Sequence, residues 1–163
     1  MSKSFGEQLT LLAGFCRDPE QANADALSHS LSELWDKRGD YLKINIRRVQ
    51  LYLLLRILEI RLKLHAGIDI TTLQGLSDYL CAAENGQRTV MVAENASFFE
   101  SELSPMIAEA MGATDYLLAL QQLEQGLQQL AKQPKRVMLS RFLLSAVPVL
   151  KGDIRSEEAV KAT

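Results

Sequence analysis

Hydrophobic residues recur every three or four positions along most of this chain, a spacing typical of amphipathic helices. The longest run, residues 41–66, is apolar almost all round in its middle turns and carries one charged strip. A helix of this kind in a globular protein must be wrapped by other helices. We therefore expect a central helix over about 41–65. Its polar strip consists of Asn45, Arg48, Tyr52, Arg56, Glu59 and Lys63.

Two helices are expected before the central one, the first over 4–16 and the second ending near residue 37. Asp18 and Pro19 between them are residues that commonly cap and begin a helix. Gly39 is expected to end the second helix, and Asp40 to cap the central one. The two buried stripes are Phe5, Leu9, Leu12 and Cys16, and then Ala24, Leu27, Leu31 and Leu34, with Trp35 beside them.

After the central helix, Thr71 and Gln74 resemble a capping box that opens another helix. Residues 87–96 have strand character, because Thr89, Val90 and Val92 are β-branched. Elsewhere the period of three and four continues, so we expect little or no strand in the protein.

Proline positions divide the C-terminal third. Ser97 and Glu100 form a second capping-box candidate, but Pro105 lies where that helix would continue. Two interpretations stay open: a short turn at 97–103 before a helix that starts at Pro105, or one kinked helix. Gly112 ends it in either case.

Two further helices are expected beyond that point. Thr114 is expected to cap a helix that runs to residue 130, and Pro134 to begin a final helix that Pro148 kinks or ends. The fold class is therefore all-α: a single-domain bundle of about six or seven helices over 1–151, wrapped around the central helix. Residues 152–163 are charged and lack an apolar stripe, so we expect a flexible tail.

Charge is balanced overall but unevenly placed. The formal net charge is -2, which gives no global attraction to nucleic acid. Residues 41–65 and 132–155 are predominantly basic, whereas residues 84–115 are predominantly acidic. We expect these blocks to neutralise one another across the fold. The acidic partners expected for the basic blocks are Glu94, Glu100, Glu102 and Glu109.

Catalytic and metal-binding patterns are absent from the sequence. His29 and His65 have no ligand pattern around them, and no glycine-rich phosphate loop or GxSxG sequence occurs. Cys16 and Cys81 match no redox spacing and are expected to be free thiols. We expect a non-enzymatic, cytoplasmic protein without cofactor, metal or membrane span.

Protein binding is the leading functional hypothesis, with a role as adaptor, chaperone or regulator and with a homodimer as one form. Residues 116–130 combine an apolar stripe with a glutamine-rich outer face, which has little charge to discourage a partner. The candidate partner-binding residues are Tyr116, Leu120, Leu123, Leu127, Leu130 and Gln125.

The alternative hypothesis is a nucleic-acid-associated regulator that uses the basic residues near 132–141 and 43–63. A cluster of cations at the start of the final helix makes that region the better exposed of the two. The candidate polyanion-binding residues are Lys132, Lys135, Arg136 and Arg141.

Overall fold

The computed structural model describes residues 3–19, 23–63, 70–81, 96–113 and 115–152, and these contain helices and turns but no strand. The prediction of an all-α fold is confirmed. The strand-like residues 87–95 lie outside the described residues. In chain order the helices are α1 (Phe5–Arg17), α2 (Ala24–Asp36), α3 (Arg38–Tyr41), α4 (Asn45–Leu62), α5 (Thr71–Cys81), α7 (Ala96–Phe98), the π-helical segment η2 (Phe99–Leu103), α8 (Ser104–Met111), α9 (Tyr116–Leu130), α10 (Val137–Leu144) and α11 (Val147–Lys151).

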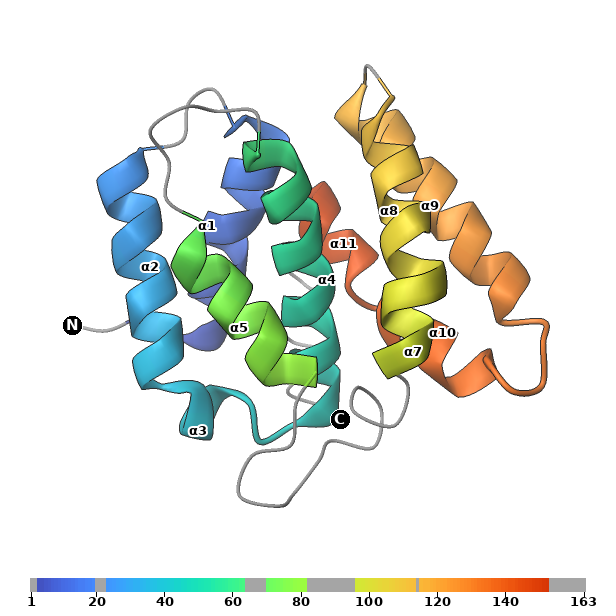
Figure 1. Cartoon of the computed structure of the whole chain (residues 1–163), viewed down its shortest axis with the longest axis horizontal. Helices are drawn as coiled ribbons and strands as arrows, with labels where there is room; N and C mark the ends of the chain where they lie inside the picture. Colours follow the sequence, from blue (N-terminus) through green and yellow to red (C-terminus); the bar gives the residue numbers. More distant parts are fainter. Residues whose placement is uncertain (1–2, 20–22, 64–69, 82–95, 114, 153–163) are drawn as a thin grey trace.

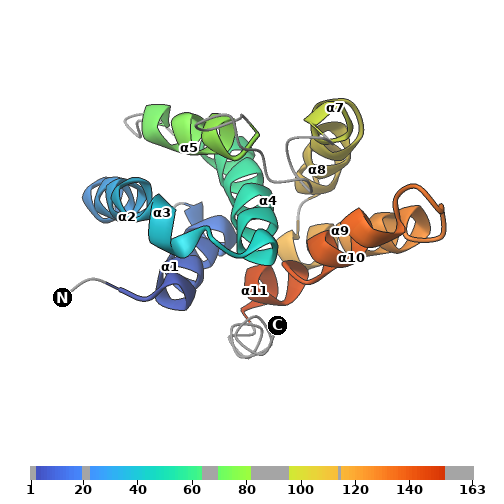
Figure 2. The ribbon, with the colours of Figure 1, turned by 90° about the horizontal axis from the view of Figure 1, so that it is seen from below.

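Helix α4 lies at the centre of the molecule in both Figure 1 and Figure 2. It packs against α1 and α5 on one side and against α8 and α10 on the other. Its middle turns, including Leu53, Leu55 and Leu58, are fully buried. The segment is apolar on nearly all sides because other helices cover it from several directions, as the sequence predicted.

The remaining helices form two groups that α4 separates (Figure 1). Helices α1, α2 and α5 form the N-terminal group, and α8, α9 and α10 form the C-terminal group. Helix α11 joins them, because it packs against both α1 and α9. A single cluster of buried apolar side chains extends from Phe5 in α1 to Leu150 in α11.

Helix α1 begins with a capping box in which the Glu7 amide donates to Ser4 Oγ at 3.2 Å. Helix α2 begins at Asn23, whose side chain accepts a hydrogen bond from the Ala26 amide at 3.0 Å. The prediction that Asp18 caps α2 is wrong. Asp18 instead ends α1, because its amide donates to the Gly14 carbonyl.

The predicted start of the central helix is also wrong. Asp40 lies inside the short helix α3, and the residue that precedes α4 is Ile44, which makes no side-chain capping hydrogen bond. The Arg48 side chain reaches back instead, and its Nε donates to the Leu42 carbonyl at 2.6 Å. The turn before α4 is therefore stabilised by a side chain from inside the helix. Capping rules describe side chains at the start of a helix that accept hydrogen bonds from its amides, so they do not predict this contact.

Pro105 lies in a helix that continues through α7, η2 and α8, which agrees with the kinked-helix interpretation. The Ser104 amide donates to the Phe99 carbonyl, five residues earlier, so the helix widens into a π turn just before the proline. The proline nitrogen has no hydrogen to donate, and the wider turn lies immediately before it in the chain. Ser97 lies inside α7 and does not act as its cap.

The C-terminal helices begin later than predicted. Asp115 caps α9 by accepting from the Leu117 amide at 2.9 Å, while Thr114 lies outside the described residues. Pro134 belongs to a turn, and α10 begins only at Val137. The helix breaks before Pro148, which occupies the first turn of α11. Gly152 ends α11 with a φ of 95°, a conformation that favours glycine.

Candidate docking groove between two helices

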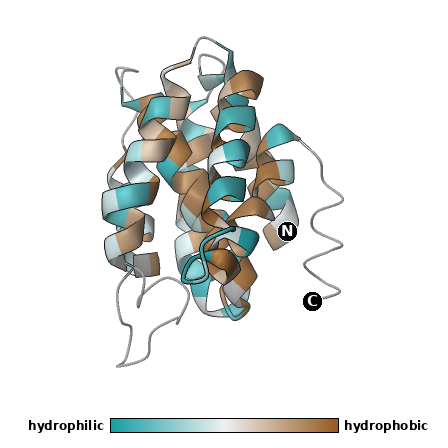
Figure 3. Ribbon diagram, turned by 90° about the vertical axis from the view of Figure 1, so that its right-hand side faces the viewer, coloured by the Kyte–Doolittle hydropathy of each residue, from teal (hydrophilic) through white to brown (hydrophobic). Residues whose placement is uncertain are grey.

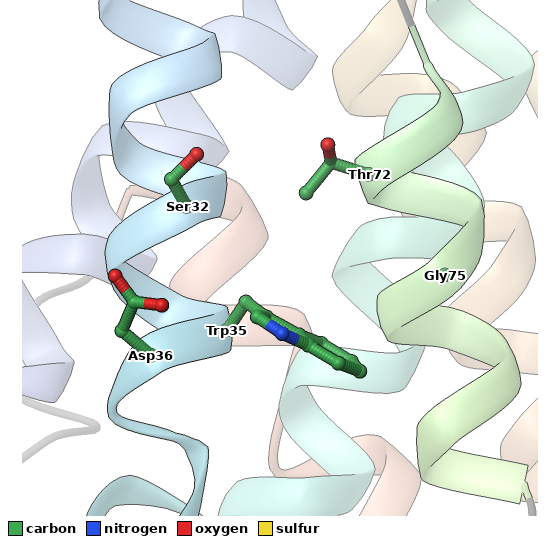
Figure 4. Close-up of a pocket in the computed structure, with 5 residues that line it drawn as sticks. All are labelled: Ser32, Trp35, Asp36, Thr72 and Gly75. Atoms are coloured by element: carbon green, nitrogen blue, oxygen red, sulfur yellow. The ribbon is translucent and has the colours of Figure 1, made fainter.

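A groove of about 310 Å³ lies between α2 and α5. Figure 4 shows the Trp35 side chain extending from α2 toward α5, with Ser32 and Thr72 on the two helices above it. Asp36 and Gly75 complete the lining. A volume of this size holds one or a few side chains of a partner, or a small ligand.

Trp35 is 37% exposed, although it follows directly after the buried Leu34. One face of its ring is covered by the Arg38 guanidinium, whose Cζ lies 4.0 Å from the ring centre. Arg38 also donates to the Trp35 carbonyl at 2.7 Å. Tyr79 of α5 meets the indole edge-on at 5.7 Å between ring centres. Cation–π and aromatic contacts therefore fix the orientation of the indole while leaving part of it exposed.

Gly75 lies in the interior of α5, where glycine costs about 1 kcal/mol relative to alanine. A Cβ at this position would meet no atom of the described residues within 4 Å. The glycine therefore neither relieves a close contact nor adopts a left-handed backbone conformation. It lines the groove together with Trp35 and leaves the space beside it free of side-chain atoms.

Charges of both signs lie at the groove. Asp36 lines it from α2, and Asp78 follows Gly75 by one turn of α5. Both carboxylates are exposed, and neither has an ion-pair partner among the described residues. Two cations lie nearby: Arg38, which covers the indole, and Arg48, which lies over the Tyr79 ring. Each of the two helices thus offers one carboxylate without an ion-pair partner, while the cations contact aromatic rings.

The predicted partner-binding residues of α9 are mostly inside the protein. Tyr116, Leu120, Leu123 and Leu127 belong to the buried core, and Leu130 is partly buried against it. Only Gln125 is exposed. Helix α9 uses its apolar stripe to pack against α8 and α10, so a partner contacting this folded state would meet its glutamine-rich face instead.

The outer face of α9 nevertheless carries two exposed leucines, Leu117 and Leu118, in its first turn. Along the helix ribbons of Figure 3, which is viewed from this side of the molecule, hydrophilic and hydrophobic residues are mixed. The α8–α9 pair also has a cavity of about 320 Å³, lined by Met106, Glu109, Ala110, Gln122 and Leu123.

The four predicted polyanion-binding residues divide into two kinds. Lys132, Lys135 and Arg141 are exposed and have no ion-pair partner among the described residues. Arg136 donates to Glu102 at 2.8 Å, and its guanidinium lies 4.6 Å from the centre of the Phe98 ring. Glu102, one of the acidic residues expected to neutralise the basic blocks, therefore pairs with Arg136.

The arginines of α4 make contacts within the protein. Arg56 pairs with the largely buried Glu59 at 3.0 Å, as the three-residue spacing suggests. Arg61 donates to the Cys16 carbonyl at 3.0 Å and lies over the Tyr116 ring. Arg47 lies 5.1 Å from the centre of the Phe5 ring. These cations contact carboxylates, helix ends and aromatic faces of their own chain.

Cys16 is a fully buried free thiol. Burial raises its pKa to about 12, despite the opposing charges of Arg61 and Arg17. A thiol that stays protonated at neutral pH is a poor nucleophile and a poor metal ligand. The Cys81 side chain and His65 lie outside the described residues, and His29 is exposed on α2. No group of three metal-ligating side chains occurs within the described part of the chain.

None of the described helices is long and apolar enough to cross a membrane. Comparison with protein-family models, with curated proteins and with solved structures found no match to this chain.

The groove between α2 and α5 was not among the sites predicted from the sequence. One feature of the sequence marks it in retrospect: Trp35 borders the buried stripe of its helix rather than continuing it. Sequence periodicity places Trp35 and Gly75 on their own helices but does not show that the two helices lie side by side.

Proposed function

We propose that this protein acts by binding another protein, as an adaptor, chaperone or regulator, and that the groove between α2 and α5 is its docking site. The observation that carries the proposal is the exposed Trp35 in a groove that Gly75 also lines, with open space where a Cβ of residue 75 would lie. Tryptophan is enriched among the residues that dominate binding energy at protein interfaces. Its orientation is already fixed by Arg38 and Tyr79, which lowers the entropy lost on binding.

Charge indicates the kind of partner. Because Asp36 lines the groove and Asp78 lies one helical turn from Gly75, an apolar side chain with lysine or arginine beside it would complement the two carboxylates. The proposal places the protein in the cytoplasm and assigns it no catalytic step. The buried, protonated Cys16 supports the second point, since it removes one candidate nucleophile.

Nucleic-acid association is the second candidate. It is favoured by the three exposed cations Lys132, Lys135 and Arg141. Three phosphate contacts are fewer than the roughly 6–10 contacts of proteins whose binding is strongly salt-dependent. The internal contacts of Arg136 and of the arginines of α4 do not add to that number in this structure.

The test is a selection of displayed helical peptides on the full-length protein. One library carries a central apolar residue between lysines and arginines, and a matched library carries glutamates at the same flanking positions. We expect the cationic library to be enriched on the wild type and on Ala108→Lys, an exposed control change on α8, but not on Gly75→Lys. Equal enrichment on wild type and Gly75→Lys would exclude the groove as the docking site.

A further inference from the structure

The turn between α9 and α10, together with the exposed face of α10, forms a cationic tip consisting of Lys132, Lys135, Met138 and Arg141. Met138 is 64% exposed, more than any other large apolar side chain of the described residues. Met138 and Arg141 are three residues apart and share the outer face of α10, opposite the buried Leu139 and Leu143.

The composition of the tip suits contact with a partner. Methionine is a flexible, polarisable side chain that adapts to irregular pockets and makes favourable contacts with aromatic rings. Lys132, Lys135 and Arg141 lack ion-pair partners among the described residues, so their charges remain available to a partner. The tip therefore combines an exposed apolar side chain with three cations, two of which are three residues from it in the sequence.

The groove between α2 and α5 has the complementary features. Trp35 offers a partly exposed indole, and Asp36 and Asp78 supply negative charge on its two helices. Its volume of about 310 Å³ leaves room for a protruding side chain such as Met138.

The groove and the tip lie at opposite ends of one molecule. Helices α2 and α10 are on opposite sides of α4 in Figure 1 and again in Figure 2. The tip of a molecule therefore cannot reach the groove of the same molecule. Any contact between the two surfaces must join two copies of the chain.

We propose that the groove of one copy receives the cationic tip of a second copy, with Met138 beside Trp35 and with Lys135 and Arg141 near Asp36 and Asp78. This inference rests on the proposed function, since it gives the docking groove a specific occupant. The contact joins two different surfaces and leaves one groove and one tip free in each pair. Association therefore continues head to tail into a ring or a short filament rather than stopping at a two-fold dimer.

The experiment uses two full-length variants, each defective in one surface. Gly75→Lys fills the groove and repels the tip, and open space at Gly75 makes the change tolerable to the fold. Met138→Glu repels the two carboxylates of the groove from the side of the tip. Ala108→Lys and Gln121→Glu make the same charge changes at exposed positions of α8 and α9 and serve as controls. Thermal melts followed by circular dichroism verify that all four variants are folded.

Molar mass is measured by light scattering at concentrations up to about 1 mM, where weak association is populated. We expect the wild type and both controls to exceed the mass of a dimer at high concentration. Each surface variant alone should remain monomeric. An equimolar mixture of the two should form a dimer and nothing larger, because only one intact groove and one intact tip can meet. Association of the wild type should weaken by about tenfold or more in high salt, since the contact is charge-complementary.

Three outcomes would overturn the inference: a monomeric wild type, a wild-type oligomer that neither surface variant disturbs, or a mixture of the variants that stays monomeric. A monomeric wild type that still binds cationic peptides through the groove would remove only the second copy as occupant. Loss of peptide binding as well would remove the proposed function.

Discussion

Gly126 of α9 and Gly75 of α5 both lie inside helices, and the two glycines have opposite surroundings. Between α8 and α9, a Cβ at Gly126 would lie 3.0 Å from Met106 Sδ, so the glycine allows close packing. Between α2 and α5, a Cβ at Gly75 would meet no described atom within 4 Å. Gly126 thus lies in close contact with a neighbouring helix, whereas Gly75 borders open space. Under the proposed function, the open space at Gly75 is part of the docking site.

The largest expected effect concerns α4, which both groups share. Leu54 is 1% exposed, so Leu54→Asp would bury a carboxylate without a partner and destabilise the protein by about 3 kcal/mol or more. Gln125→Asp, on the exposed face of α9, should cost less than about 0.5 kcal/mol. Chemical denaturation of both variants measures the difference. Similar unfolding midpoints for the two would show that the assignment of inside and outside is wrong.

The comparison of the two glycines predicts that replacement by leucine has contrasting effects on the stability of the protein at the two positions. Gly126→Leu should destabilise the protein by about 1–3 kcal/mol, because the new side chain overpacks the α8–α9 contact around Met106. Gly75→Leu should be neutral or stabilise by up to about 1 kcal/mol, because it replaces a helical glycine without a clash.

Unfolding free energies of the two leucine variants test this contrast. A loss of stability at Gly75 as large as that at Gly126 would show that the groove is closed in solution, and the distinction between the two helix pairs would fail.

The architecture could be predicted from the sequence because the helical period of apolar residues survives tertiary packing. The central helix and the stripe of α9 both follow from the spacing of apolar residues alone. The predicted helix boundaries were less accurate, because several neighbouring polar residues could each serve as the N-cap of a helix. Asn23 and Asp115 cap their helices where Asp18 and Thr114 were predicted.

The candidate site could not be predicted for a different reason. Periodicity identified the stripe of α9 as apolar, but it does not say whether a partner or the chain's own helices cover that stripe. Leu123 and Leu127 are covered by the chain itself. The groove depends on α2 lying beside α5, a pairing between segments about 40 residues apart that no local rule specifies.

The smallest expected effect concerns nucleic acid. Mixed-sequence DNA or RNA should bind no more tightly than about 10⁻⁴ M at physiological salt, because the tip offers only three cations and the arginines of α4 contact groups of their own chain. The double variant Lys132→Glu/Lys135→Glu should then change little. A titration at two salt concentrations measures this. Micromolar binding that falls steeply with salt and weakens in the double variant would favour the nucleic-acid alternative.

The central claim is that partners bind in the groove between α2 and α5, and Trp35 allows it to be tested directly because it is the only tryptophan in the chain. The measurement is Trp35 fluorescence with acrylamide quenching, during titration of the full-length protein with a selected cationic peptide that lacks tryptophan. We predict a shift of emission to shorter wavelength and a loss of quenching that follow peptide occupancy, with neither change in Gly75→Lys. Saturating binding that leaves the emission and quenching of Trp35 unchanged would contradict the account.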